Sequence, residues 1–110
     1  PDYCVSKVRS LSKGGREDAA LRCLKFFLDM RASLSEMFRV LKPGAKSAII
    51  IGNNHFKVAN QWVEVENISA ILQMGVARGF EKDGIVQRPL EKTSSGMIRQ
   101  EAIVLLRKPR

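Results

Sequence analysis

The chain has 110 residues, of which 45% are hydrophobic and 27% are charged. This composition is typical of one globular domain with a modest core and argues against a disordered tail. The formal net charge of +8 attracts polyanions whatever the fold, so we expect nucleic acid as a partner. No apolar run reaches the roughly 18 residues of a membrane span, and there is no cleavable leader. We therefore expect a cytoplasmic protein that makes no membrane contact.

Residue types that bind metals are few and scattered along the chain. Cys4 and Cys23 are too far apart in sequence for a redox or zinc pair, and His55 is the single histidine. We expect no metal site. Both cysteines are expected to be small, buried or half-buried hydrophobic residues in a reducing compartment.

Residues 1–15 show no sustained periodicity and include the pair Gly14-Gly15, so they are predicted to form a loop. This stretch and the residue after it hold the densest basic run of the chain: Lys7, Arg9, Lys13 and Arg16. One interpretation is sequence-independent contact with nucleic-acid phosphates. The other is a disordered basic terminus.

Residues 16–41 carry apolar side chains at helical spacing, with acidic residues near the start and basic residues near the end. Pro43-Gly44 then stops the pattern. The predicted element is one long amphipathic helix. Its predicted apolar stripe consists of Ala20, Leu24, Phe27, Leu34, Met37, Phe38 and Leu41.

Residues 47–51 contain three consecutive isoleucines and are apolar on both faces, which predicts a buried strand of a covered sheet. The polar stretch from Gly52 to Asn60 is predicted to be a loop at the carboxyl end of that strand. Ligands bind at this edge of open α/β sheets, so Gly52, Asn53 and Asn54 are candidate substrate-binding residues. The alternative is that the asparagines only form a turn.

A second helix is predicted over residues 65–78, with Val65, Ile68, Leu72 and Val76 on one face and Gly79 closing it in the left-handed region. Trp62, just before this helix, is expected to be a packing residue.

Residues 81–88 and 98–107 are predicted to be strands joined as an antiparallel hairpin. Arg99, near the start of the last strand, is a further candidate substrate contact, although a solvated strand end has the same pattern. The whole chain is therefore predicted to be a single α/β domain with an antiparallel addition.

The segment Glu36-Met37-Phe38-Arg39-Val40-Leu41-Lys42-Pro43-Gly44 is followed after two residues by a strand. It resembles the RVLKPGG segment of class I S-adenosylmethionine-dependent methyltransferases, with Ala45 in place of the second glycine. The element order is similar to the carboxy-terminal half of their Rossmann-like sheet, in which the seventh strand runs antiparallel between the fifth and sixth. The resemblance implies a partial methyltransferase sheet with further polypeptide upstream of Pro1.

Three further stretches resemble the DNA methyltransferases that methylate cytosine N4 or adenine N6: the strand end at residues 51–53, the pair Gly79-Phe80, and residues 98–109. Asp2-Tyr3 followed by Lys7 is similar to the sequence after the catalytic tetrapeptide in some members. The resemblance implies DNA methylation with S-adenosylmethionine as cofactor and DNA as partner. Two alternatives remain: a class I methyltransferase acting on RNA or a small molecule, and a non-catalytic basic nucleic-acid-binding module.

The motifs that carry the chemistry in that family do not occur in this chain. There is no Ser-Pro-Pro-Tyr or Asp-Pro-Pro-Tyr tetrapeptide to hold the flipped base, and no glycine-rich loop follows a strand. We assign no catalytic or cofactor-binding residue. The cofactor is expected in the full-length protein only, and this chain alone is expected to be inactive.

The strand at residues 47–51 is expected to lack a partner on one side, because a fourth strand of the complete sheet is not among the predicted elements. An apolar edge without a partner is a site of association. We expect a homodimer through this edge, or poor solubility.

Overall fold

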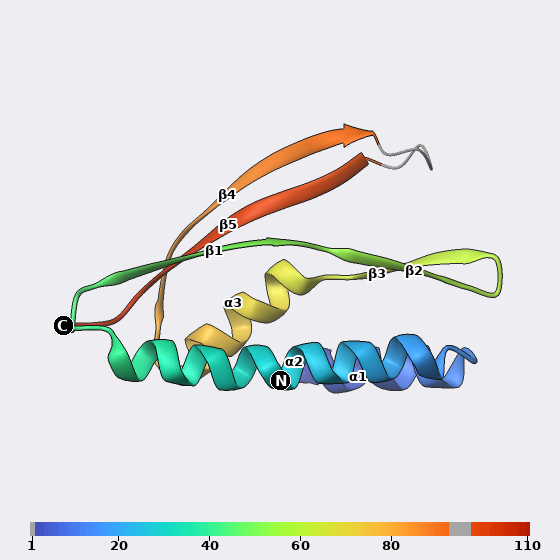
Figure 1. The fold of residues 1–110 in the computed structure, drawn as a ribbon, viewed down its shortest axis with the longest axis horizontal. Coiled ribbons are helices and arrows are strands. Elements are labelled where there is room, and N and C mark those ends of the chain that lie inside the picture. Colours follow the sequence, from blue (N-terminus) through green and yellow to red (C-terminus); the bar gives the residue numbers. More distant parts are fainter. Residues whose placement is uncertain (1, 93–97) are drawn as a thin grey trace.

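The computed structural model describes residues 2–92 and 98–110. Its element order is α1 (Asp2–Lys13), α2 (Glu17–Val40), β1 (Lys46–Gly52), β2 (Asn54–Val58), β3 (Gln61–Val65), α3 (Asn67–Arg78), β4 (Glu81–Lys92) and β5 (Ile98–Arg107). Figure 1 shows α2 along the length of the molecule, α1 beside its amino-terminal half, and α3 between α2 and the sheet. The fold is mixed α/β, as the sequence predicts.

The main sheet has the strand order β1-β5-β4, and β5 is antiparallel to both neighbours. Strands β1 and β4 therefore run parallel to each other on either side of β5. The register places Ile103 of β5 opposite Ile50 of β1 and Val86 of β4. The three predicted strands and the antiparallel pairing of the last two are confirmed. The prediction that residues 47–51 form a buried strand was wrong, because the helices cover only one face of the sheet: no residue of β1 is buried, and Ile50 is 63% exposed.

Helix α3 covers one face of this sheet, and its backbone packs close to β5. Side chains alternate along β5, and Ala102, Val104 and Leu106 point into the core, each with 1% exposure or less. A Cβ added to Gly75 of α3 would lie 2.8 Å from Leu106 Cδ1. A glycine inside this helix thus lets its backbone approach β5, which outweighs the low helix propensity of glycine.

The bounds and the buried face of α3 differ from the prediction. The helix starts at Asn67, since Val65 belongs to β3. Its buried side includes Ile71 and Met74, whereas Val76 is 50% exposed. The predicted face was right at Ile68, which is buried, and at Leu72, which packs partly buried against the core, but wrong at Val76. Gly75, next to Val76, is the residue that faces Leu106 of β5.

Helix α2 confirms the predicted helix over residues 16–41, with Ala20, Phe27 and Leu34 buried. One turn differs from the predicted stripe: Cys23 is 3% exposed and Leu24 is 41% exposed. The turn after α2 is fixed by the carboxyl end of the chain.

Lys108 closes this turn. Its Nζ donates hydrogen bonds to the carbonyls of Phe38 (2.7 Å) and Leu41 (2.9 Å), and its own carbonyl accepts from the Gly44 N–H (2.7 Å). A cation at a helix carboxyl end satisfies otherwise unpaired carbonyls. Gly44 has a φ of +84°, whereas Ala45 does not have a positive φ. Alanine in place of the family's second glycine therefore causes no backbone strain.

Residues 1–15 are not a loop over the described range, because residues 2–13 form helix α1. Cys4, Val8 and Leu11 recur at helical spacing and pack into the core. Gly15, with a φ of +84°, ends the helix, and the Arg16 N–H donates to the Leu11 carbonyl at 2.9 Å. Gly14 and Gly15 thus lie at the end of this helix and do not belong to a longer loop.

The prediction of a loop from Gly52 to Asn60 was also wrong. Strand β2 lies within this range, and it forms a hairpin with β3, which follows the range. Ala59 and Asn60 form the turn, with φ values of 48° and 66°. Both central residues of a type I′ turn require positive φ, and Asn-Gly is the usual sequence signal for it. Ala-Asn is a weak signal for such a turn.

Replacing Gly79 with alanine is expected to destabilise the fold by about 1–3 kcal/mol. Gly79 has a φ of +126°, and an added Cβ would lie 2.9 Å from Phe38 Cζ. Gly84→Ala is the control, since its Cβ would make an ordinary 3.8 Å contact with Leu105 Cδ1. Urea unfolding of both variants measures the difference, and equal midpoints would contradict the expectation.

Candidate functional site

The candidate substrate-binding residues after β1 hold the start of helix α3. The Gly52 carbonyl accepts a hydrogen bond from Asn67 Nδ2 at 3.1 Å, and Asn53 Oδ1 accepts one from the Ile68 N–H at 3.1 Å. Glu66, the N-cap residue, makes no capping bond with its side chain. Asn53 therefore caps α3 from a distant point in the sequence and satisfies a free helical N–H.

Next to this anchor lies a cavity of about 220 Å³ between α2, β2 and α3. The residues that line it are Arg22, Cys23, Phe26, Asn54, His55, Phe56 and Asn67. Of the predicted substrate-binding residues, only Asn54 lines this cavity. Arg99 belongs to β5, but its side chain lies outside the part of the chain that the structure describes.

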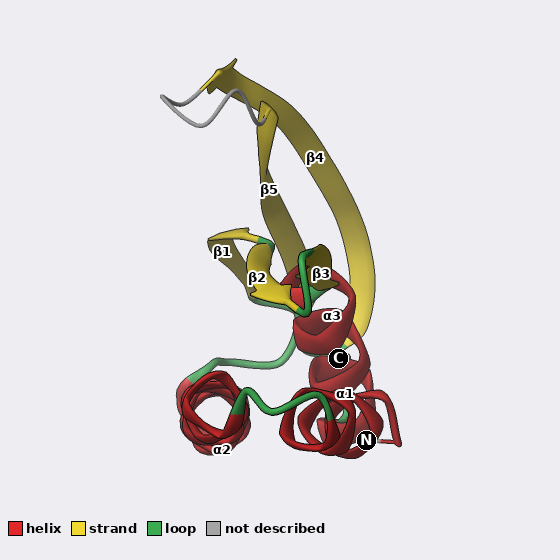
Figure 2. Ribbon diagram, turned by 90° about the vertical axis from the view of Figure 1, so that its right-hand side faces the viewer, coloured by secondary structure: helices red, strands yellow, loops and turns green. Residues whose placement is uncertain are grey.

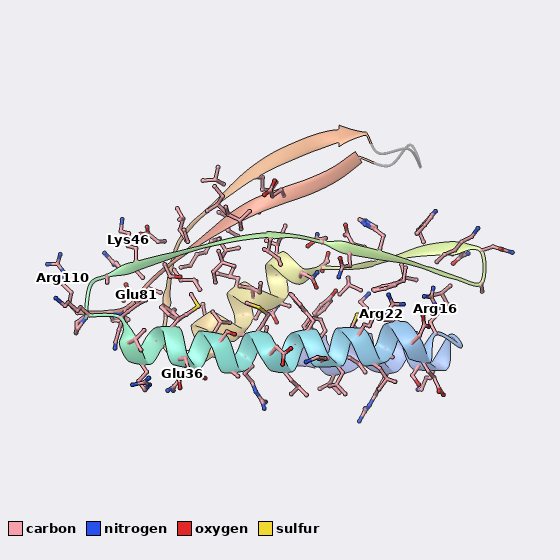
Figure 3. All side chains as sticks on the ribbon, in the orientation of Figure 1. Arg16, Arg22, Glu36, Lys46, Glu81 and Arg110 are labelled. Atoms are coloured by element: carbon pink, nitrogen blue, oxygen red, sulfur yellow. The ribbon has the colours of Figure 1, made fainter. Side chains whose placement is uncertain are left out.

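Two arginines and one aspartate form a cluster beside this cavity, and Arg22 is the member that lines it. Asp18 accepts from Arg16 Nε at 2.9 Å and from Arg22 Nη2 at 2.8 Å. Both guanidinium carbons lie 5.7 Å from the centroid of the Phe56 ring, a distance at which cation–π attraction acts. The hydrogen bond from Arg16 holds the pKa of the Asp18 carboxyl well below its usual range. Figure 3 shows both arginines at the same end of the molecule.

Arg16 also links α2 to the hairpin, because its Nη1 donates to the Lys57 carbonyl at 2.6 Å. This arginine has a structural role whether or not it also contacts phosphate. The other members of the predicted basic run lie on α1.

Helix α1 places Arg9 and Lys13 together on one exposed face. They line a shallow hollow of about 600 Å³ with Ser6 and Ser10, at the helical spacing of three and four residues. Lys7 is on another side of the helix, with its Nζ 5.6 Å from the centroid of the Tyr3 ring. The structure therefore brings two of the four predicted phosphate contacts into one hollow, together with two hydroxyl groups.

Hairpin β2–β3 adds two exposed residues that sequence reasoning did not assign to a site. Trp62 is 57% exposed, so the expectation of a packing residue was wrong. It lies opposite Lys57 in the antiparallel register. Exposed tryptophan next to lysine is a combination that stacks on bases and attracts phosphate. The hairpin that presents it gave no strong sequence signal.

Cys4 and Cys23 are free and buried, as predicted, and burial raises the pKa of both thiols. Within residues 2–92 and 98–110, no group of three His, Cys, Asp or Glu side chains is placed to hold a metal ion. None of the helices in the same ranges is long and apolar enough to span a membrane.

No protein-family model matches this sequence, and the search of curated proteins finds no match. Solved structures do match the fold. A protein of Thermus thermophilus, provisionally named a DNA modification methylase, was crystallised with S-adenosyl-L-methionine. This complex matches 84% of the chain with a TM-score of 0.66 and 18% identity. Another crystal structure of the same protein matches 94% of the chain with a TM-score of 0.62 and 23% identity.

The chain spans 41% of the methylase chain in the first match and 42% in the second. It therefore has a methyltransferase-like fold, and the predicted resemblance to a partial class I methyltransferase sheet is confirmed at the level of the fold. S-adenosyl-L-methionine is the cofactor bound to that methylase.

Proposed function

We propose that this chain is part of an S-adenosylmethionine-dependent DNA methyltransferase that modifies the exocyclic amine of cytosine or adenine. The observation that carries the proposal is the sheet. Strand β5 lies antiparallel between β1 and β4, with α2 and α3 in the adjoining layer, and this arrangement matches the methylase with a TM-score of 0.66. The net charge of +8 and the basic face of α1 support DNA as the partner.

The described residues at the end of β1 do not form a binding site for the cofactor. The Gly52 carbonyl and the Asn53 side chain are bonded to α3, and β2 begins at the next residue. A glycine-rich turn with free backbone N–H groups is the usual solution for a cofactor of this kind. We propose that the cofactor is bound mainly by polypeptide outside this chain, and that this chain alone does not transfer methyl groups.

Helix α1 is the proposed DNA contact. Arg9 and Lys13 supply charge, and Ser6 and Ser10 supply hydroxyl donors, which together suit phosphate oxygens and carry no sequence information. Contacts that distinguish one DNA sequence from another would have to come from residues outside α1. The exposed Trp62 of the hairpin is the described side chain best suited to stack on a base.

The double variant Arg9→Ala/Lys13→Ala is expected to bind duplex DNA more weakly than the parent chain. Each lost phosphate contact reduces the slope of log affinity against log salt by about 0.9, so the slope should fall by nearly 2. Fluorescence anisotropy with a labelled duplex across a salt series measures both quantities.

The control is Lys42→Ala/Lys82→Ala, which removes the same charge from exposed positions just after α2 and at the start of β4. Figure 1 shows these ends of α2 and β4 at the opposite end of the molecule from α1. It should change the slope little. Equal losses in the two double variants would show that the overall charge binds DNA and that α1 is not the contact surface.

We also propose that two copies associate through β1. Among the described strands, β1 pairs with β5 alone, so its other edge presents free N–H and C=O groups. The sheet face away from the helices is apolar, with Ile50 63% and Val86 53% exposed. Figure 2 shows all three helices on the other side of the sheet. A second copy would cover both the edge and this face.

Ile50→Lys is expected to shift the chain from dimer to monomer, because it places a charge in the centre of this face. Val40→Lys is the control, since Val40 is 62% exposed at the end of α2 and is not part of the sheet. Sedimentation velocity at several concentrations measures the association. A parent chain that stays monomeric and soluble throughout would contradict this part of the proposal.

A further inference from the structure

Helices α1 and α2 leave an apolar groove between them. Figure 2 shows the two helices side by side, on the side of α3 that faces away from the sheet. The groove has a volume of about 260 Å³ and is lined mainly by apolar side chains. Phe27 of α2 and Met74 of α3, both 4% exposed, form its inner wall. Val5, Leu24 and Leu28 form its rim, and each of them is at least 41% exposed.

The apolar surface continues beyond this groove along α2. Leu21, Leu24 and Leu28 recur at spacings of three and four residues, so they lie on one side of the helix. Leu21 is 67% exposed and does not line the groove. With a rise of about 1.5 Å per residue, the three leucines extend over roughly 10 Å, about two turns. An extended apolar stripe beside a groove is the kind of surface that receives the apolar face of an amphipathic helix.

The charged residues that line the groove are Arg9 of α1 and Arg31 of α2. A short turn joins the two helices, so they run in opposite directions, and the two arginines border opposite ends of the groove. Among the described residues, the ion pairs do not include either guanidinium group. Asp29, the carboxylate nearest to Arg31 in sequence, already pairs with Lys25 at 3.0 Å. An occupant with carboxylates toward both of its ends would therefore complement the groove.

We propose that this groove is a docking site for an amphipathic helix of another polypeptide, with apolar residues at helical spacing and acidic residues flanking them. Its apolar side chains cover Leu24 and Leu28 and enter the groove, and its carboxylates pair with Arg9 and Arg31. A second copy of this chain fits the groove less well, because its own α1 and α2 bring the same arginines to the contact. A small amphiphile such as a fatty acid would fill the groove but leave Leu21 uncovered.

Two synthetic peptides test the charge preference. Both place leucines at helical spacing in an alanine background, and they differ only in carrying glutamate or lysine at the flanking positions. The glutamate peptide is expected to bind at least about tenfold more tightly, because only its side chains pair with the two arginines. Since the net charge of +8 attracts any acidic peptide, the position of binding must be measured as well. Titrations followed by ¹H–¹⁵N NMR should shift the signals of Val5, Leu24 and Leu28.

Two variants and their matched controls test the individual contacts. Leu28→Asn should weaken binding of the glutamate peptide at least about tenfold, because an apolar side chain in the centre of a contact anchors the partner. Val40→Asn is its control, since Val40 is 62% exposed on α2 outside the groove, and this variant should bind as the parent does. Arg31→Gln should weaken binding several-fold and reduce its salt dependence, whereas Lys42→Gln, which removes the same charge, should do neither. Thermal melts of all four variants establish that each one is folded.

Failure of the glutamate peptide to bind, equal affinities for the two peptides, or shifts confined to other residues would overturn the proposal. Binding of laurate at the groove with no binding of either peptide would overturn it in favour of a small amphiphile. Self-association of the chain that Leu28→Asn abolishes and Ile50→Lys leaves intact would overturn it in favour of a second copy. Arg9 also borders the hollow on α1, and all of these variants leave it unchanged, so failure of the proposed DNA contact and failure of this site are distinguishable.

Discussion

The close packing of α3 against β5 and the end of β1 is the constraint on which the rest of the structure depends. Gly75 lets the helix backbone approach Leu106, and the start of the helix is held by Asn53 and by the bond from Asn67 to Gly52. Its other end turns at Gly79 into Phe80, which meets Phe38 of α2 edge-on at 5.1 Å. The sheet, α3 and α2 are thereby fixed as one unit.

This packing determines where functional groups gather. Helix α2 runs back along the molecule, so its first turns, the β2–β3 hairpin and the end of α1 lie at one end. Lys46, Glu81 and Arg110 mark the other end (Figure 3). The hollow lined by Arg9 and Lys13 lies on α1, and the cavity lined by Asn67 lies between α2, β2 and α3.

Sequence patterns predicted the long helix, the three strands of the sheet and the left-handed closure at Gly79, because each has a strong local signal. The β2–β3 hairpin escaped prediction because its turn is Ala59-Asn60 and lacks a glycine. Helix α1 escaped because the helical spacing of Cys4, Val8 and Leu11 covers only about two turns before Gly14-Gly15 ends it. The cavity was not predictable, since Arg22, Phe56 and Asn67 are brought together only by tertiary packing.

We propose that this chain supplies strands of the sheet and a DNA contact to a methyltransferase, and that the cofactor site lies mainly in other polypeptide. Titration calorimetry with S-adenosylmethionine on the isolated chain tests it most directly. We predict no binding in the micromolar range, because the residues after β1 hold α3 and leave no cradle for the cofactor. Micromolar affinity with one molecule bound per chain would contradict the claim and place the cofactor site within these 110 residues.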